Sequence, residues 1–382
     1  MYTGQGLVDD FLAFGYDTGA SLTTNAFYSP SRFYKGEPTT NLGPIDLASW
    51  GTEGSAQRIA TGRTYRDQPT YNCRTTVGEV YRGIDNTISN LRTAAGSGGT
   101  VTMSVFVRND NSSSYGFSAY MGHDFSSTRT IAANSDWQQI QWTVNQSSMN
   151  NDYVEFRPYT NNADIYLEMT MPQVEVNKGH ATQHTSTTRS NTDSLIDLKR
   201  NQTIDLSNTE FTSNADLFYN GTSNYTEISN YTHHQSLAGT IEAVVKLDTN
   251  TGNRYVFGAG GTSTYGGSRA LRVNSGNWGI VTYGSGTEDW GTGVAAPTNT
   301  WQHIAFGWSN TTVYFYINGV RTSTTKTGLV KPLGTLLRVG MPPWSISSGF
   351  HGQIPILRHY TTLLTEAEMK VNFERIRHRF GI

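Results

Sequence analysis

The chain is a series of short segments in which apolar and polar residues alternate, separated by turns rich in glycine, serine and asparagine. Residues 100–109 show this most clearly, because Val101, Met103, Val105 and Val107 fall on one face of an extended strand. Short strands at this spacing, joined by polar turns, are typical of antiparallel sandwiches and jelly rolls. The sequence therefore predicts an all-β protein with two antiparallel β-sandwich (jelly-roll) domains.

The strand-like segments form two groups along the chain. The first group covers residues 100–109, 115–122, 137–145, 153–159 and 164–176. The second covers residues 216–228, 239–248, 254–260, 269–284, 301–309, 312–322, 336–340 and 350–360. Within the second group, Asn318-Gly319 predicts a type I′ hairpin turn.

Only the end of the chain has a strong helical pattern. Thr365 and Glu368 have the spacing of a capping box. The residues that follow at helical spacing form one apolar face, made by Met369, Phe373, Ile376 and Phe380. We expect a short C-terminal α-helix over residues 366–379, packed on a sandwich or on a neighbouring subunit.

Composition excludes several classes of protein. The net charge is −2 and no basic stripe is present, which argues against nucleic-acid binding. No run approaches eighteen apolar residues, and the first residues lack the basic and apolar regions of a signal peptide, so we expect neither a membrane span nor an export signal. The single cysteine, Cys73, permits no disulfide within the chain and is interpreted as a buried apolar residue.

Several segments of the second group resemble a known family. "WQHIAFGW" at 301–308, "VYFYINGV" at 313–320 and "FHGQIPILRHYTTLLTEAEM" at 350–369 look like the final strands of the concanavalin A-like/laminin-G-like domain. "DLFYNGTSNYTEI" at 216–228 resembles an early strand of that family, and "VNFERIRHRFGI" is similar to the tail of many phage structural proteins that carry this domain. The resemblance implies a lectin-like sandwich.

The first group has a second resemblance. "MPQVEVNKGHATQHT" at 171–185 looks like the closing strand and exit of carbohydrate-binding-module-like jelly rolls in phage proteins. "GLVDDFLAFGYD" at 6–17 resembles the first strand of the lectin-like domain itself, although it lies far from residues 194–211, which normally follow it closely. We therefore expect an insertion, because insertions are tolerated where termini lie close together. A plain tandem, with residues 6–17 as an assembly arm, is the alternative.

The expected boundaries follow from these two resemblances. Residues 1–44 hold the first strand of the lectin-like sandwich and a loop, and residues 45–178 form the carbohydrate-binding-module-like jelly roll. Residues 179–193 are a polar linker. Residues 194–382 form the remaining lectin-like sandwich with the terminal helix.

The sequence shows no catalytic centre. The lectin-like fold also hosts glucanases, but their pattern of strand carboxylates is absent, and Glu288 and Asp289 are adjacent in a Gly-rich loop. His233 and His234 are interpreted as a polar loop rather than a metal site, and His303 as a structural residue. We expect no enzyme activity, no metal ligand and no cofactor. Calcium is a candidate only because the resembled families often carry it.

Aromatic residues in or beside loops are the best candidates for binding sugars, which stack on such rings. Trp290, Trp344 and Tyr283 are the main candidates in the second domain, and Trp50, Tyr115 and Tyr120 are weaker ones in the first. Alternatively, each anchors a loop or lies in a subunit interface. The tryptophans within strand patterns are expected in cores: Trp137, Trp142, Trp301 and Trp308.

The leading hypothesis is a non-enzymatic phage virion structural protein: a tail fibre, baseplate appendage or capsid decoration. It would be made in the host cytoplasm, bind other virion proteins and form a homo-oligomer, most simply a trimer. Host-surface polysaccharide is the expected ligand. A stand-alone carbohydrate-binding lectin and a polysaccharide-degrading glycosidase are the alternatives.

Overall fold

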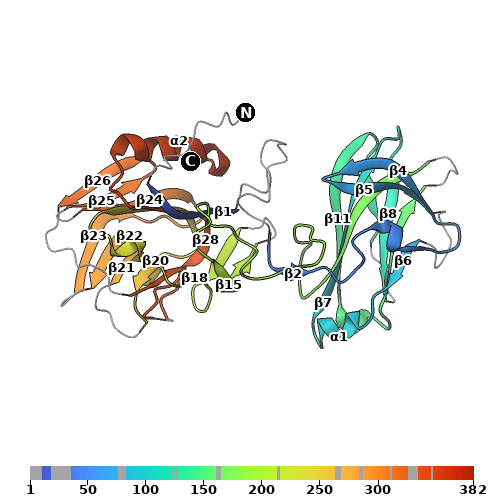
Figure 1. Cartoon of the computed structure of the whole chain (residues 1–382), viewed down its shortest axis with the longest axis horizontal. Coiled ribbons are helices and arrows are strands. Elements are labelled where there is room, and N and C mark those ends of the chain that lie inside the picture. The colour runs from blue at the N-terminus through green and yellow to red at the C-terminus, as the bar shows by residue number, and fades with distance from the viewer. Residues whose placement is uncertain are drawn as a thin grey trace. The chain divides into compact units, whose positions relative to one another are not determined.

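The structure is a computed structural model that describes residues 11–18, 36–75, 83–122, 124–125, 127–160, 165–212, 216–262, 268–283, 287–309, 312–325, 334–345 and 347–382. The chain forms two compact units, each with its own hydrophobic core (Figure 1). Unit 1 contains the described residues of Met1–Glu37 and Ser190–Ile382, and unit 2 contains those of Pro38–Arg189. The chain therefore starts in unit 1, forms unit 2, and returns to complete unit 1.

One sheet of unit 1 has eight strands in the order β16-β17-β28-β19-β24-β25-β26, with β1 paired to β28 beside this path. Its strands are β1 (Leu12–Asp17), β16 (Glu210–Phe211), β17 (Leu217–Asn220), β19 (Gly239–Leu247), β24 (Trp301–Trp308), β25 (Thr312–Ile317), β26 (Val320–Thr325) and β28 (His351–Tyr360). The turn between β25 and β26 has positive φ at both Asn318 (50°) and Gly319 (77°), which confirms the predicted type I′ hairpin.

The second sheet of unit 1 has seven strands in the order β15-β18-β27-β20-β21-β22-β23. They are β15 (Asp205–Asn208), β18 (Tyr225–Ile228), β20 (Asn253–Gly260), β21 (Ser268–Asn274), β22 (Asn277–Tyr283), β23 (Thr287–Ala295) and β27 (Leu336–Val339). Residues 216–228 were expected to form a single strand, but they form β17 and β18 in different sheets. The chain turns between these strands at Gly221, where φ is 81°.

Alternation along the strands fills the space between these two sheets. In β19, Ile241, Ala243 and Val245 point into the core, and Glu242 and Val244 point to the opposite face. From β1, Phe14 and Tyr16 are fully buried in the same core. The all-β sandwich prediction is confirmed, and residues 6–10 of the predicted first strand lie outside the described residues.

Helix α2 (Glu366–Phe380) lies on the outer face of the eight-stranded sheet (Figure 1). The capping box of Thr365 and Glu368 is present as predicted. Met369 and Ile376 are buried against the sheet, while Phe373 and Phe380 are half-buried. Among the described residues, no helix is both long enough and apolar enough to cross a membrane.

Unit 2 is a second sandwich. One sheet contains β3 (Gly51–Thr52), β6 (Ile84–Thr87), β8 (Tyr115–Met121), β9 (Asp124–Phe125), β10 (Arg129–Ile131) and β12 (Tyr153–Tyr159). The five-stranded sheet, in the order β11-β7-β13-β5-β4, contains β4 (Gln57–Tyr65), β5 (Gln68–Arg74), β7 (Thr100–Asn109), β11 (Ser135–Asn145) and β13 (Leu167–Val176). A short helix, α1 (Leu91–Ala95), precedes β7. Cys73 is buried in the core between the sheets, and its burial raises the pKa of the thiol.

Residues 179–189, which we call the strap, differ from the expected free linker. The strap packs on the outer face of the five-stranded sheet, where the Thr182 amide and hydroxyl donate to Glu175 and the Thr185 amide donates to Gln173. It ends in β14 (Thr188–Arg189), which pairs with β2 (Thr39–Thr40). Buried Glu175 accepts these bonds from Thr182 and a further one from Thr39, and this satisfied carboxylate holds the strap on the sheet.

Candidate functional site

The outer faces of the two sheets of unit 1 differ in what covers them. Helix α2 covers the outer face of the eight-stranded sheet. The outer face of the seven-stranded sheet carries aromatic and arginine side chains, and we call this group the Trp344 face: Tyr225, Tyr255, Arg272, Arg338 and Trp344. This combination of rings and fixed donors is the one that suits a sugar.

Trp344 reaches this face from the loop between β27 and β28. Its ring is half-buried and meets the Tyr255 ring edge-on, with 6.1 Å between centroids and an interplanar angle of 87°. The loop can lie this close to the sheet because β20 has a glycine below it. A Cβ on Gly258 would come within 2.8 Å of the Pro342 Cα atom. The sequence therefore builds a close approach that leaves Trp344 partly exposed.

Two arginines fix the polar part of the Trp344 face. Arg272 lies over the Tyr255 ring at 5.7 Å and donates to Asn253 Oδ1 at 2.8 Å. Arg338 lies over the half-buried Tyr225 ring at 4.3 Å, and its Nε donates to Glu227 Oε2 at 2.8 Å. Stacked guanidinium groups held by such bonds are preorganised donors.

The sequence prediction identified only Trp344 of this group. Tyr225, Tyr255, Arg272 and Arg338 were not identified because each lies within a strand pattern, whereas sugar-binding candidates were sought in or beside loops. Alternation gives a signal for Arg338, which lies between buried Leu337 and Val339. It gives none for Tyr255, because a bulge between Tyr255 and Phe257 interrupts the alternation.

The other two main candidates of unit 1 were expected in or beside loops. Trp290 lies within β23, where its backbone is opposite Ile280. Tyr283 is the last residue of β22. Glu288 and Asp289 also lie in β23 rather than in a loop. The side chains of residues 283–290 lie outside the described structure, so the Trp344 face is defined without them.

The weaker candidates in unit 2 pack against other side chains rather than being exposed to solvent. Tyr120 is 6% exposed, lies against the Tyr153 ring at 5.8 Å and has the Arg157 guanidinium 5.6 Å away. Trp50 is 2% exposed in the core, and half-buried Tyr115 packs against that core. A sugar cannot stack on a ring that is already covered on both sides, so these predictions are corrected for Trp50 and Tyr120.

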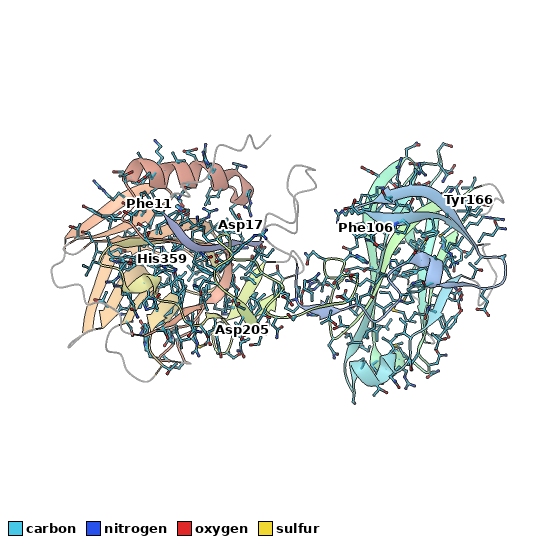
Figure 2. The ribbon with its side chains drawn as sticks, viewed as in Figure 1. Phe11, Asp17, Phe106, Tyr166, Asp205 and His359 are labelled. Carbon is cyan, nitrogen blue, oxygen red and sulfur yellow. The ribbon has the colours of Figure 1, made fainter. Side chains whose placement is uncertain are left out.

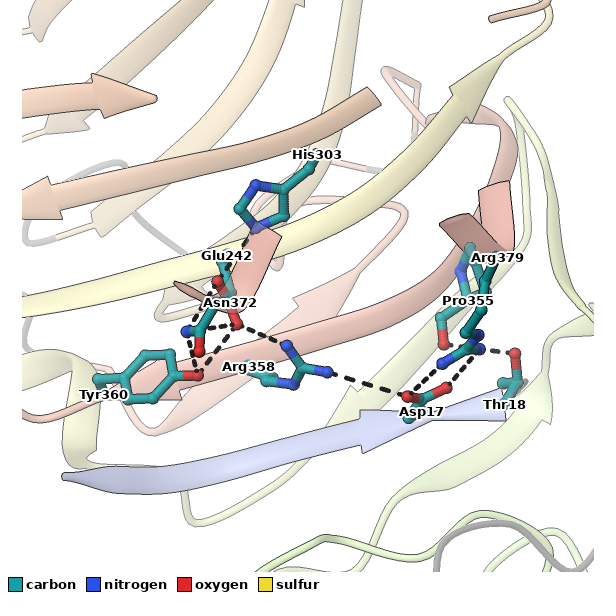
Figure 3. Close-up of polar contacts among 9 residues, drawn as sticks. All are labelled: Asp17, Thr18, Glu242, His303, Pro355, Arg358, Tyr360, Asn372 and Arg379. Carbon is teal, nitrogen blue, oxygen red and sulfur yellow. Dashed lines mark hydrogen bonds and ion pairs between the residues drawn. The ribbon is translucent and has the colours of Figure 1, made fainter. Parts of the chain in front are cut away.

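A buried polar cluster lies beneath α2, around the carboxylate of Glu242 (Figure 3). Glu242 accepts hydrogen bonds from Arg358 at 2.8 Å and Tyr360 at 3.0 Å, and lies 3.1 Å from His303 Nε2. Asn372 of α2 donates to both oxygens of the carboxylate. Burial alone would raise the pKa of Glu242, but Arg358 and His303 outweigh it and hold the pKa at about 2. The carboxylate is ionised, saturated and closed to ligands.

The same cluster extends to the N-terminal strand. Asp17 of β1 accepts two hydrogen bonds from Arg379 of α2, at 2.8 and 2.9 Å, and lies 3.9 Å from Arg358 (Figure 3). Asp17 and Arg379 thus join the first described strand to the last helix. The cluster is a structural clamp between the two ends of the chain.

Two buried histidines, His234 and His359, form a second cluster in unit 1. His233 and His234 were expected to lie in a polar loop, but His234 is buried. His234 stacks on Tyr231 at 5.7 Å and 10°, and the Tyr231 hydroxyl bonds His359 Nδ1. Arg269 lies over the Trp308 ring at 4.7 Å. Burial, and then Arg269, lower the pKa of His234 to about 4, while burial and His234 lower that of His359 well below its usual value.

These neutral histidines should make unit 1 sensitive to acid. The folded-state pKa of His234 lies below its unfolded value of 6.5, so its contribution is complete above pH 6.5 and is lost as pH falls toward 4. That gap corresponds to about 3 kcal/mol. We expect His234→Phe to flatten the loss of unfolding free energy between pH 6.5 and 4, measured by urea unfolding. The exposed-site control His378→Phe should keep the wild-type slope, and an unchanged slope in His234→Phe would contradict this assignment.

Within the described ranges, no group of three or more His, Cys, Asp or Glu side chains is arranged to hold a metal ion. These residues therefore provide no set of ligands for calcium, which was considered as a candidate ion. His233 and His234, which were weighed as a metal pair, lie in a short 3₁₀ turn (His233–Gln235) with His234 buried.

Comparison with known proteins agrees with the sandwich geometry of unit 1. Residues 220–370 match the model of the concanavalin A-like lectin/glucanases superfamily. No curated protein sequence matches the chain.

Several solved structures share partial similarity. Domain 4 of AbnA, an extracellular arabinanase from Geobacillus stearothermophilus solved with arabinotriose, is 22% identical over 41% of this chain and 75% of that one, with a TM-score of 0.35. The Ruminococcus gnavus IT-sialidase CBM40 bound to α2,3-sialyllactose is 17% identical over 36% and 83%, with a TM-score of 0.32. Botulinum neurotoxin type C is 9% identical over 48% of each chain, with a TM-score of 0.38. Residues 220–370, within unit 1, have a concanavalin A-like lectin fold.

Proposed function

We propose that the protein binds carbohydrate without cleaving it, through the Trp344 face of unit 1. The observation that carries this proposal is the half-buried Trp344 ring, which is held against Tyr255 on the face that also carries the fixed guanidinium group of Arg338. The ring offers an apolar surface to a sugar face, and the partly exposed Arg338 and Glu227 offer bonds to hydroxyls.

We further propose that this binding serves a bacteriophage particle, as a tail fibre, baseplate appendage or capsid decoration. The support is the likeness of residues 371–382 to the tail of many phage structural proteins and of residues 171–185 to jelly rolls in phage proteins, together with a composition low in charge, at 15% of residues. The proposed partners are other virion proteins and further copies of the chain, with a trimer as the simplest assembly. The ligand would be host-surface polysaccharide.

The non-enzymatic part of the proposal is supported by the state of the buried acid in the lectin-like unit. Glu242 has its oxygens occupied by Arg358, Tyr360, His303 and Asn372, and its lowered pKa keeps it ionised. A glycosidase needs an accessible pair of carboxyl groups on either side of the scissile bond, one of them protonated. Glu242 cannot take that part.

The Trp344 face is tested by removing its exposed ring. Trp344→Ala should weaken binding to the best ligand on an array of bacterial surface polysaccharides by at least tenfold, which corresponds to about 1.4 kcal/mol. Trp301→Ala, which removes a half-buried tryptophan on the opposite sheet beside α2, is the matched control and should bind like the wild type. Equal binding by all three proteins would contradict the assignment of the site, and a mass of 42.1 kDa for the protein in solution would favour the stand-alone lectin.

A further inference from the structure

Unit 2 lies outside the matched family region, and its five-stranded sheet carries a polar recess of about 230 Å³ on the outer face. β5 and β13 form the floor, where Asn72 is opposite Glu168. β4 and the turn that follows β7 form the walls. The lining residues are Arg63, Asn72, Asp110, Asn111, Tyr166 and Glu168. This is a different surface from the Trp344 face of unit 1.

The walls of the recess are held by their own hydrogen bonds. Glu168, with its side chain 6% exposed, accepts from Arg63 at 2.7 Å and from the Thr70 hydroxyl at 2.5 Å. Asn111 donates to the Tyr166 carbonyl at 2.9 Å. Arg63 itself is 55% exposed, so it keeps donors available to a ligand. The recess is therefore a preorganised polar surface rather than a gap between loose side chains.

An aromatic bridge closes the outer face beside the recess. Tyr65 and Trp137 belong to β4 and β11, the opposite edges of the five-stranded sheet, yet their rings stack at 4.5 Å and 18°. This contact requires the sheet to curl, so that side chains from its two edge strands meet over its outer face. Phe106 of β7 lies 5.7 Å from Tyr65, and the Arg66 guanidinium lies 5.0 Å from Phe106. Figure 2 labels Phe106, which contacts the bridge, and Tyr166, which lines the recess.

Beyond the bridge, the strap occupies the rest of the face. Gln139 donates to the Thr182 carbonyl at 3.4 Å, Gln141 accepts from the Ala181 amide, and Gln173 accepts from the Thr185 amide at 2.8 Å. The polar groups of that half are already used by the chain itself. In the part of the chain that the structure describes, the recess is the open end of this outer face. The bridge covers the middle of the face, and the strap covers the other end.

We infer that this recess is a second binding site, which takes the terminal unit of a neutral saccharide. The lining favours many hydroxyl contacts, because it offers carboxylate and amide acceptors beside guanidinium and amide donors. Each lining carboxylate is paired with an arginine, Glu168 with Arg63 at 2.7 Å and Asp110 with Arg108 at 2.6 Å. This balance of charge favours a neutral ligand over an anionic one, and the polar lining disfavours an apolar one. The volume is below the 300–1,000 Å³ typical of sites for drug-sized ligands, so one sugar ring is the matching size.

The bridge decides which part of a saccharide fits. A chain bound along the sheet would have to pass through the Tyr65–Trp137 stack and the strap. Only a chain end can enter, so the units beyond the first project away from the protein. Binding strength should therefore depend on the terminal sugar and hardly at all on chain length.

The test uses the full chain and a panel of neutral oligosaccharides of one to six units, ending in glucose, galactose, mannose, N-acetylglucosamine or N-acetylgalactosamine. Titration calorimetry should find at least one terminal sugar whose affinity changes by less than threefold from one unit to six. Asn72→Trp, which fills the recess, should abolish this binding, and Arg63→Ala, at a 55% exposed side chain, should weaken it at least tenfold. Asn145→Trp, at an exposed position at the far end of β11, is the matched control and should bind normally.

The outcomes separate this site from the Trp344 face. Trp344→Ala should leave recess binding unchanged, so failure of one site does not decide the other. The inference is overturned if no panel member binds in a manner sensitive to Arg63→Ala. It is also overturned if affinity rises more than tenfold with chain length, because that would require an open groove.

Discussion

Deleting residues 1–17 should unfold unit 1 while unit 2 keeps its structure. The deletion removes β1, which supplies Phe14 and Tyr16 to the main core and Leu12 to the core beneath α2. Burial of three such side chains contributes about 5–8 kcal/mol, against a total of about 5–15 kcal/mol for a folded domain. The deletion also leaves Arg379 without its Asp17 partner.

Hydrogen exchange measures this result separately in each unit. Amides of β19 and β28 should lose protection in the shortened chain, whereas those of β7 and β13 should keep it. Full protection of β28 without residues 1–17 would show that β1 is only an accessory arm, as in the tandem alternative.

Single substitutions in the same strand give a finer test of that claim. Phe14→Ala should cost about 3–5 kcal/mol, because it leaves a cavity in a closed core. Phe11→Ala, at a 49% exposed phenylalanine immediately before β1, is the matched control and should change stability by less than about 0.5 kcal/mol.

Glu242→Ala is expected to lower the unfolding free energy of unit 1 by about 3–5 kcal/mol, because removing one partner leaves the buried Arg358 charge without its carboxylate. Glu374→Ala is the matched control. It breaks an exposed pair with Arg377 in α2, which is worth less than about 1 kcal/mol. Urea-dependent hydrogen exchange in β19 and α2 measures the loss of unfolding free energy in each variant. Equal losses would show that the buried cluster beneath α2 contributes no more to stability than the control pair.

Acid gives an independent check on Glu242. Its folded-state pKa of about 2 lies below the ordinary value of 4.5, so its contribution is complete above pH 4.5 and is lost as pH falls toward 2. Below pH 4, Glu242→Ala should therefore lose less stability on further acidification than the wild type. The histidine cluster acts earlier, between pH 6.5 and 4, so the two effects occur in different pH windows.

Local patterns in the sequence predicted much of the fold. The alternation of residues 100–109, the Asn318-Gly319 turn and the Thr365–Glu368 capping box each determine local geometry, and each is present as expected. The strap was not predictable in this way, because its polar residues resemble a linker. Their role depends on buried Glu175 and Gln173, which lie on a different strand.

The candidate sites were harder to predict for the same physical reason. Trp137 and Trp301 occupy strand patterns and were expected in cores, but both are half-buried on outer faces. Alternation fixes which residues share a face, and it does not say which face is covered. Trp137 is stacked by Tyr65 only because the sheet curls, a property of five strands together rather than of any segment.

The central claim is that this chain binds saccharide and leaves it intact, and one incubation tests both parts. The best ligand of the array would be labelled with a fluorophore and mixed with an excess of tagged protein. Two quantities would be measured from the same tube: the fraction of polysaccharide that sediments with the protein, and the length of the polysaccharide by size-exclusion chromatography. The account predicts that the polysaccharide sediments with the protein and keeps its original length. Polysaccharide that stays unbound, or that is recovered shortened, would contradict it.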